Sequence, residues 1–331
     1  MNVGKIPENV LKRAVLGHID NKREEILIGA GVGEDCAVLC LKEGEVYVTS
    51  TDPITGTAKD IGKLAVLVTA NDLASSGAEP VGILISALLP DGFTEPELRE
   101  IMVQVNEQCT KHNIQLMGGH TEITRAVNQP ILTVTGVGKI QKDKLITTGG
   151  AKPDQDIVVS KYIALEGTSI IAKEKEDELL TRYPKEMIKR AQGYDEYISV
   201  VNEGRIAAEV GVSAMHDVTE GGIFGALWEM AEASNVGLDI DLKSIKVRQE
   251  TVEICEYFGI NPYKLISSGC LLIATSEGEK VVDAINREGI EATIIGKATD
   301  SNDRRLINGG EIRFLETPAK DELYQVIGGR E

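Results

Sequence analysis

The sequence predicts a two-lobed protein of the α/β or α+β class. Three observations favour this class: the 331 residues exceed the usual length of one domain, strand-like and helix-like segments alternate, and a polar, glycine-rich stretch interrupts the alternation. That stretch, residues 147–154, is the best candidate for a boundary. We therefore expect one domain at residues 1–150 and a second at residues 151–331.

Hydrophobic periodicity predicts the elements of the N-terminal half. The strands are expected at residues 36–40, 46–51, 81–89, 114–117 and 131–140. The helices are expected at residues 1–20, 61–77 and 95–111. Thr94 directly precedes the last of these helices and is a candidate N-cap.

The same alternation resumes after residue 154. The expected strands are residues 157–162, 212–215, 238–242, 270–275 and 294–297, with a terminal hairpin around residues 308–310. The expected helices are residues 168–183, 203–210, 223–234 and 279–287. The alternation in both halves supports the expected α/β or α+β protein of two lobes.

Composition excludes several kinds of partner and compartment. With 35 Lys and Arg against 52 Asp and Glu, the net charge of −17 would repel nucleic acid and anionic membranes. The longest apolar stretches, such as residues 81–90, are shorter than the ~20 residues that span a bilayer. The N-terminus lacks the apolar core of a signal peptide, so we expect a cytoplasmic protein.

The five cysteines do not indicate a zinc site or a disulfide framework. Their number is odd and no C-x-x-C pair occurs. Cys36 and Cys40 fall on one side of an expected strand, so we expect them to be buried core thiols.

Two common nucleotide motifs are absent. No G-x-x-x-x-G-K-[ST] sequence occurs, which excludes a P-loop. The run from Gly29 to Gly33 is followed by Glu34, where a dinucleotide fingerprint would have its last glycine, and then by a strand pattern. Two interpretations remain: an ordinary flexible loop, or a glycine-rich segment whose N–H groups approach phosphates.

Several acidic residues occur where they could bind Mg²⁺. Asp35 follows the glycine-rich run, and Asp52 ends a strand. Asn71 and Asp72 interrupt an otherwise apolar helix, and burying them without partners would be costly. Asp35 and Asp52 are either cation ligands or solvated turn residues, and Asn71 and Asp72 either face a cation or are paired in the core.

Other polar residues are candidates for phosphate or acceptor contacts. Asp60 is an expected N-cap for the helix at residues 61–77, and Lys63 in its first turn is either a phosphate contact or a surface lysine. Two clusters follow expected strands: residues 118–122 (Gly-Gly-His-Thr-Glu) and residues 216–222 (His-Asp-Val-Thr-Glu-Gly-Gly). Asp217 or Thr219 could simply cap the following helix, and a lone histidine is by default a core residue.

Taken in order, these motifs resemble the ATP-binding superfamily of aminoimidazole ribonucleotide (AIR) synthetase, the PurM-like superfamily. The resemblance spans residues 29–315 and is greatest to the hydrogenase-maturation protein HypE and AIR synthase-related proteins. It rests on five motifs in order: Gly33-Glu34-Asp35-Cys36-Ala37-Val38; Ser50-Thr51-Asp52; Asp60-Ile61-Gly62-Lys63-Leu64-Ala65 with Asn71-Asp72-Leu73-Ala74; Gly118-Gly119-His120-Thr121-Glu122; and His216-Asp217-Val218-Thr219-Glu220-Gly221-Gly222.

The resemblance implies a fold and a site. It implies a two-lobe subunit whose N-terminal strands form a barrel shared between two copies in a homodimer, with ATP and Mg²⁺ as cofactors. It implies metal ligands at Asp35, Asp52, Asp72 and Glu122. The implied nucleotide contacts are Gly31, Gly33, Asp35, Lys63, Asn71, Gly118, Gly119 and Thr121, and the implied catalytic residues are Lys63, Asp72, His120 and Asp217.

Two positions depart from the family pattern. His120 occupies a place where many members have an acid, so a metal contact there is either lost or moved to Glu122. HypE proteins end in a cysteine that carries their substrate, whereas this sequence ends Gly328-Gly329-Arg330-Glu331. We therefore expect HypE-like chemistry without that cysteine.

The expected activity is ATP-dependent phosphorylation of an amide- or carbamoyl-type acceptor, either a small molecule or a group carried by a protein. Catalysis of this kind relies on positioning and charge neutralisation, and it needs no protein nucleophile. Two alternatives remain open: a thiamine-monophosphate kinase or AIR synthetase-type ligase, and a non-enzymatic nucleotide-binding dimer.

Overall fold

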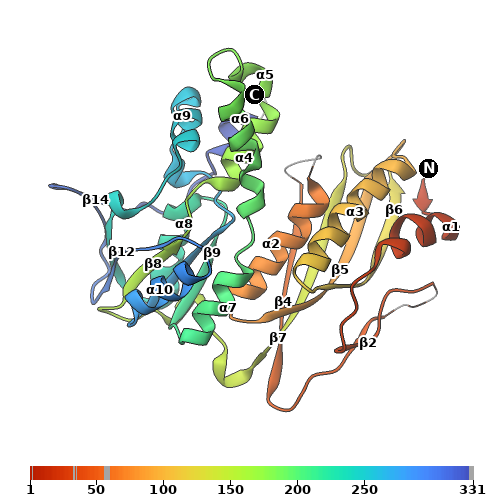
Figure 1. Cartoon of the computed structure of the whole chain (residues 1–331), viewed down its shortest axis with the longest axis horizontal. Coiled ribbons are helices and arrows are strands. Elements are labelled where there is room, and N and C mark those ends of the chain that lie inside the picture. The colour runs from red at the N-terminus through yellow and green to blue at the C-terminus, as the bar shows by residue number, and fades with distance from the viewer. Residues whose placement is uncertain (2, 33, 35, 56–59, 328–331) are drawn as a thin grey trace. The chain divides into compact units, whose positions relative to one another are not determined.

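The computed structural model describes residues 1–331 except 2, 33, 35, 56–59 and 328–331 (Figure 1). The chain divides into two compact units, one of residues 1–73 and 78–145 and one of residues 74–77 and 146–331. Each unit contains a sheet and helices, which confirms the expected mixed α/β class. Within the described residues, no helix combines the length and the apolar character needed to cross a membrane.

The N-terminal unit is built on a five-stranded sheet in the order β1-β6-β5-β7-β4. Strands β5 and β6 are parallel, and β7 lies antiparallel between β5 and β4. The bounds are β1 Gly4–Lys5, β4 Glu45–Ile54, β5 Glu79–Pro90, β6 Gln115–Thr124 and β7 Ile131–Gln141.

Helices α2 (Ile61–Ser75) and α3 (Glu95–Lys111) belong to the same unit as this sheet (Figure 1). Helix α2 lies so close to β7 that a Cβ on Gly136 would overlap the side chain of Thr69. From Ile83 to Pro90, buried residues of β5 alternate with half-buried ones. This alternation defines a helix-facing side of the sheet and a second face.

Helix α3 begins and ends as predicted. The Thr94 side chain caps the helix by accepting a hydrogen bond from the N–H of Glu97. The Glu97 carboxylate completes a capping box by accepting a hydrogen bond from the N–H of Thr94. The buried apolar residues recur at helical spacing: Leu98, Ile101, Met102, Val105 and Cys109.

The first forty residues differ from the prediction. In place of one helix at residues 1–20, β1 is followed by three short helical turns, Glu8–Val10 (α1), Leu11–Val15 and Leu16–His18. Strands β2 (Ile26–Ile28) and β3 (Val38–Leu39) form a two-stranded ribbon. Cys36 and Cys40 are exposed, so the prediction of core thiols was wrong. A two-stranded ribbon has no second layer to bury its side chains.

The C-terminal unit contains a seven-stranded sheet in the order β14-β13-β10-β12-β8-β11-β9. Only the β10–β13 pair is parallel among these pairings of described residues. The strand bounds are β8 Asp156–Ser160, β9 Ala214–Val218, β10 Gly237–Asp241, β11 Cys270–Thr275, β12 Ala292–Thr299, β13 Arg304–Asn308 and β14 Glu311–Phe314.

Helices cover both faces of the central strands. Ile157 and Val159 of β8 pack with α8, whereas Val158 between them packs with α7 and α10, and all of β11 is buried. A further core joins α4, α6, α9 and α11. The helix bounds are α4 Leu165–Glu174, α5 Glu176–Leu179, α6 Lys185–Gln192, α7 Val201–Val210, α8 Gly222–Ser234, α9 Gln249–Phe258, α10 Gly278–Arg287 and α11 Leu323–Ile327.

Helix α4 and the two polar clusters differ from the prediction. The expected helix at residues 168–183 is interrupted at Lys175, which separates α4 from α5. The two polar clusters do not simply follow strands: residues 118–122 lie inside β6, and His216 and Asp217 lie inside β9. Backbone pairing with β5 continues through residues 118–122, and pairing with β11 continues through His216 and Asp217.

Candidate functional site

Two of the predicted acids meet at one serine hydroxyl. Alternation along β4 places Ser50 and Asp52 on the helix-facing side of the sheet, where α2 presents Asp72. Ser50 Oγ lies 2.5 Å from Asp72 Oδ2 and 3.2 Å from Asp52 Oδ2. A serine has one hydroxyl proton and donates to one carboxylate at a time. Two carboxylates gathered in this way favour a cation between them.

Within the described residues, no three His, Cys, Asp or Glu side chains already form a metal-binding group. Asp35 and Gly33, which the sequence predicts at this site, lie outside the described residues. The described part of the predicted metal set is therefore the Asp52–Asp72 pair together with Glu122.

The remaining predicted residues of α2 lie at its two ends. Asn71 is buried next to Asp72, and Lys63 is half-buried in the first turn. The carbonyl of Asp60 accepts from Leu64 N at 3.0 Å, which places Asp60 at the start of the helix as expected. The N–H of Gly62 donates to Gln104 Oε1 at 3.0 Å. This first-turn N–H is thus already used within the protein.

The register of the sheet aligns Gly119 with Asp52. Gly119 pairs with Ile85, Ile85 with Val134, and Val134 with Asp52, so the four residues form one row across four strands. At ~4.8 Å between neighbouring strands, the row spans about 14 Å. The glycine-rich part of β6 and the acidic pair therefore lie at opposite ends of one row.

His120 and Glu122 lie on the other face of the sheet. His120 pairs with Ser86 and Glu122 with Leu88, and these β5 residues alternate with the buried ones. His120 Nε2 lies 3.1 Å from Glu122 Oε2. The structure does not bring Glu122 to Asp52 and Asp72, because neighbouring strand positions point to opposite faces.

A cavity of about 360 Å³ lies beside the glycines of β6. Its lining includes Gly31, Gly118, Gly119, His120 and Thr121 of the predicted site. Most of its remaining walls are apolar, with Ile101, Met102, Val105 and Leu116 among them. A cavity of this size with a mostly apolar lining is typical of a small-molecule site.

Gly119 has a steric requirement that can be tested. Its φ is +146°, and a Cβ there would overlap the carbonyl oxygen of Ile85. We expect Gly119→Ala to lower the free energy of unfolding by about 3 kcal/mol in urea titrations. Gly92→Ala is the control: its φ is +90° but the surrounding space is open, so a loss of about 1 kcal/mol is expected. Equal losses would contradict the close approach.

In the C-terminal unit, Asp217 is buried on β9, where it pairs with Leu271 of β11. Its neighbour His216 lies 2.8 Å from Glu229 of α8 through Nε2 and Oε2. Gly222 has a φ of +61°, and a Cβ there would lie 2.7 Å from the carbonyl oxygen of Leu265. The loop after β9 therefore fits closely against the segment before β11.

The sequence analysis missed one buried acid close to this loop. Glu166, in the first turn of α4, is 5% exposed, and its Oε2 atom has no hydrogen-bond partner among the residues that the structure describes. Burial raises the pKa of Glu166 to about 7, opposed by hydrogen bonds from Ser268. The carboxylates of Asp321 and Glu220 raise it further. The only sequence signal was one acid within a run of small and apolar residues.

The C-terminal segment contacts the same loop. Asp321 Oδ2 accepts from Gly221 N at 2.7 Å, and its Oδ1 accepts from Leu323 N at 2.8 Å. Tyr324 donates its hydroxyl to Glu220 Oε1 at 2.6 Å, which helps to raise the pKa of Tyr324 to about 12. These contacts hold α11 against the loop that carries the predicted acceptor-positioning motif.

Several curated proteins are similar to this chain over most of its length. A "Putative hydrogenase expression/formation protein" of Methanocaldococcus jannaschii is 27% identical, covering 98% of this chain and 97% of the relative. Carbamoyl dehydratase HypE of Rhodobacter capsulatus is 28% identical over 82% of this chain and 78% of its own. Thiamine-monophosphate kinase of Bacillus subtilis is 27% identical over 64% of this chain and 67% of the relative.

Among solved structures, hydrogenase maturation protein HypE in complex with ATP superimposes with a TM-score of 0.81. The match covers 97% of each chain at 21% identity and shows a common fold, as the expected PurM-like architecture requires. Residues 33–140 match the model of the AIR synthase related protein N-terminal domain, and residues 152–308 match that of its C-terminal domain. The chain therefore belongs to the family of AIR synthase related proteins.

Proposed function

We propose that this chain is an enzyme that uses ATP and Mg²⁺ to phosphorylate an oxygen atom of an amide- or carbamoyl-type acceptor, as in HypE-like relatives. The observation that carries the proposal is the meeting of Asp52 and Asp72 at the hydroxyl of Ser50. Two acids on one hydroxyl fit a divalent cation, which prefers carboxylate oxygens. The similarity to a carbamoyl dehydratase supports the acceptor class.

The residues divide into three groups by the chemistry they offer. Asp52 and Asp72, with Asp35, would hold Mg²⁺ through carboxylate oxygens. The ammonium group of Lys63 would oppose phosphate charge. The nucleotide contacts would come from the glycines and small polar residues of the predicted set, which are Gly31, Gly33, Asn71, Gly118, Gly119 and Thr121.

The residues of the chain would bind and orient the nucleotide and the acceptor, and they would exclude water from the site. The apolar walls of the cavity beside β6 would shelter the base, while the row from Gly119 to Asp52 leads from that cavity to the acids. When bound, ATP supplies the phosphoryl group that makes a poor leaving oxygen a good one. Asp217 would position the acceptor or add a further acidic ligand, and no protein nucleophile is needed.

A homodimer is part of the same proposal. On β4 the residues of the second face, Tyr47, Thr49, Thr51 and Pro53, are exposed, with Tyr47 45% exposed. A sheet with one covered face and one partly apolar open face supports association with a second copy. Sedimentation at micromolar concentration should give twice the mass of the chain, and a monomer would contradict this part.

Thiamine-monophosphate kinase activity is the second candidate, favoured by the relative from Bacillus subtilis. Both candidates share the ATP half of the site and differ in the acceptor. The test is release of ADP by the purified protein with Mg²⁺ over carbamoyl, formamide and thiamine-phosphate acceptors. We expect turnover with a carbamoyl-type acceptor. Turnover with thiamine phosphate alone would favour the kinase, and ATP binding without any turnover would favour a non-enzymatic nucleotide-binding dimer.

A further inference from the structure

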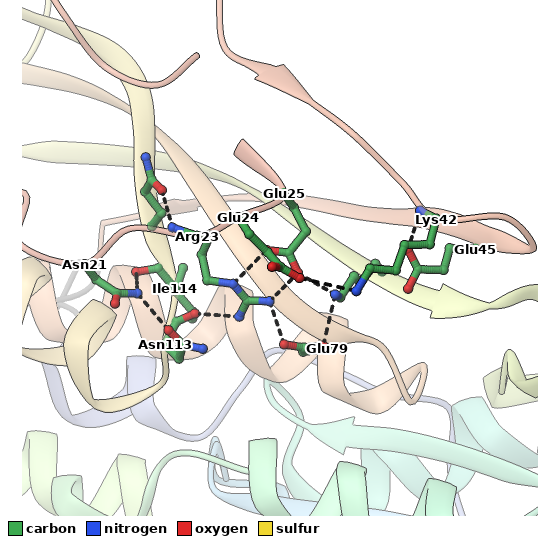
Figure 2. Close-up of polar contacts among 11 residues, drawn as sticks. Asn21, Arg23, Glu24, Glu25, Lys42, Glu45, Glu79, Asn113 and Ile114 are labelled. Atoms are coloured by element: carbon green, nitrogen blue, oxygen red, sulfur yellow. Dashed lines mark hydrogen bonds and ion pairs between the residues drawn. The ribbon is translucent and has the colours of Figure 1, made fainter. Parts of the chain in front are cut away.

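A buried ion cluster lies at the base of the β2–β3 ribbon (Figure 2). The guanidinium of Arg23 donates to both oxygens of Glu25, with Nη2–Oε1 at 2.7 Å and Nε–Oε2 at 3.0 Å. Its Nη2 also donates to Glu79 Oε1 at 2.6 Å, and its Nη1 to the carbonyl of Asn113 at 2.9 Å. Lys139 Nζ donates to Glu25 Oε1. The cluster thus joins the chain before β2 to β5, β6 and β7.

The cluster pairs two cations with two carboxylates, of which Glu79 is 53% exposed and the other, Glu25, is buried. The side chains of Arg23, Glu25 and Lys139 are 7%, 6% and 11% exposed. Hydrogen bonding to Arg23 is the main cause that holds the pKa of Glu25 at about 2, against the opposing effect of burial. The carboxylate therefore stays ionised across the physiological range. A buried ion pair is weak evidence for net stability, whereas removing one partner leaves a buried charge without compensation.

Backbone N–H groups also hold the base of the ribbon in place. Arg23 N donates to the side chain of Gln115 at 2.7 Å, and Cys40 N donates to the carbonyl of Glu25 at 2.8 Å. A Cβ on Gly29 would come within 2.7 Å of Gln115 Nε2. Both ends of the ribbon are thus held where the chain leaves and returns to the sheet.

Beyond this base, the ribbon has little packing to hold it. Leu27, Ile28 and Val38 of β2 and β3 are exposed, and so is Val32 between the strands. A two-stranded ribbon is marginally stable by itself, so its direction depends on what fixes its base. The chain between its strands carries Gly31, Gly33 and Asp35 of the predicted nucleotide and metal set.

We propose that Arg23, Glu25 and Lys139 are positioning residues for nucleotide binding, an inference that rests on the proposed function. By fixing the base of the ribbon, they restrict the directions in which the glycine-rich chain leaves the sheet. A loop that becomes ordered only on binding loses conformational entropy, which lowers the affinity for the ligand. Residues that fix the base of the ribbon beforehand reduce this cost, and they strengthen nucleotide binding without contacting the nucleotide.

The test measures affinity for Mg²⁺ with the non-hydrolysable ATP analogue AMPPCP by calorimetry in two variants. Arg23→Lys keeps the charge but loses the two-pronged contact, and we expect its Kd to rise about tenfold. Glu79→Gln removes only the half-exposed partner, and a rise of about threefold is expected. The control Lys42→Gln breaks an exposed ion pair on the ribbon itself, Lys42–Glu24 at 3.3 Å, and should leave Kd unchanged.

Two further readouts separate positioning from plain stability. Hydrogen exchange of residues 26–40 in Arg23→Lys should accelerate without nucleotide and return to the wild-type rate with it. If the wild type turns over, KM for ATP should rise while kcat at saturation stays within about twofold. A wild type that binds no nucleotide would refute the proposed function. A wild type that binds, with both cluster variants binding equally well, would overturn this inference alone.

Discussion

Replacing Asp72 with asparagine is expected to reduce ATP turnover by about 100-fold or more. The Asp72 carboxylate shares the Ser50 hydroxyl with Asp52, and asparagine keeps its shape and its hydrogen-bond acceptor while removing one negative charge. Loss of a metal-ligand charge that stabilises phosphoryl transfer corresponds to about 3 kcal/mol of activation free energy. The measurement is ADP release at saturating acceptor over a Mg²⁺ titration.

The matched control is Asp91→Asn in the same unit. Asp91 is exposed just after the end of β5 and pairs with Arg125 at 3.0 Å through Oδ2 and Nε. We expect wild-type turnover and wild-type Mg²⁺ dependence from this variant, because exposed ion pairs contribute little. If Asp72→Asn were as active as Asp91→Asn, the assignment of the metal site would be removed.

Local patterns predicted the elements that frame the site. The Thr94 cap and the apolar spacing of residues 95–111 fix α3, and alternation along β4 places Ser50 and Asp52 on one face. The polar interruption at Asp72 in an apolar helix singled out a residue that the structure places at the Ser50 hydroxyl together with Asp52. These signals lie within a few residues of one another, which is why a sequence reveals them.

What depends on strand register could not be predicted in this way. Treating residues 118–122 as a cluster after a strand left the direction of each side chain open, and β6 in fact continues through them. His120 and Glu122 consequently face away from Asp52. The Arg23–Lys139 cluster joins segments more than a hundred residues apart, and no local pattern encodes such a contact.

Glu166 leads to the second large expected effect, a dependence of stability on pH. Its pKa is about 7 in the folded chain, above the ordinary value of 4.5, because burial disfavours the ionised form. A folded-state pKa that is raised means that the native protein binds the proton more tightly than the unfolded chain. The stabilisation is therefore fully present below pH 4.5 and is lost as the pH rises through 7.

Replacing Glu166 with glutamine should remove this loss. At 1.36 kcal/mol for each pKa unit, the variant is expected to be more stable than the wild type by about 3 kcal/mol at pH 8. At pH 4.5 or below, where Glu166 is already protonated, the two proteins should unfold alike. Urea unfolding of both proteins at several pH values measures the difference, so other titrating groups cancel. A difference that does not change between pH 4.5 and pH 8 would show that folding does not raise the pKa of Glu166.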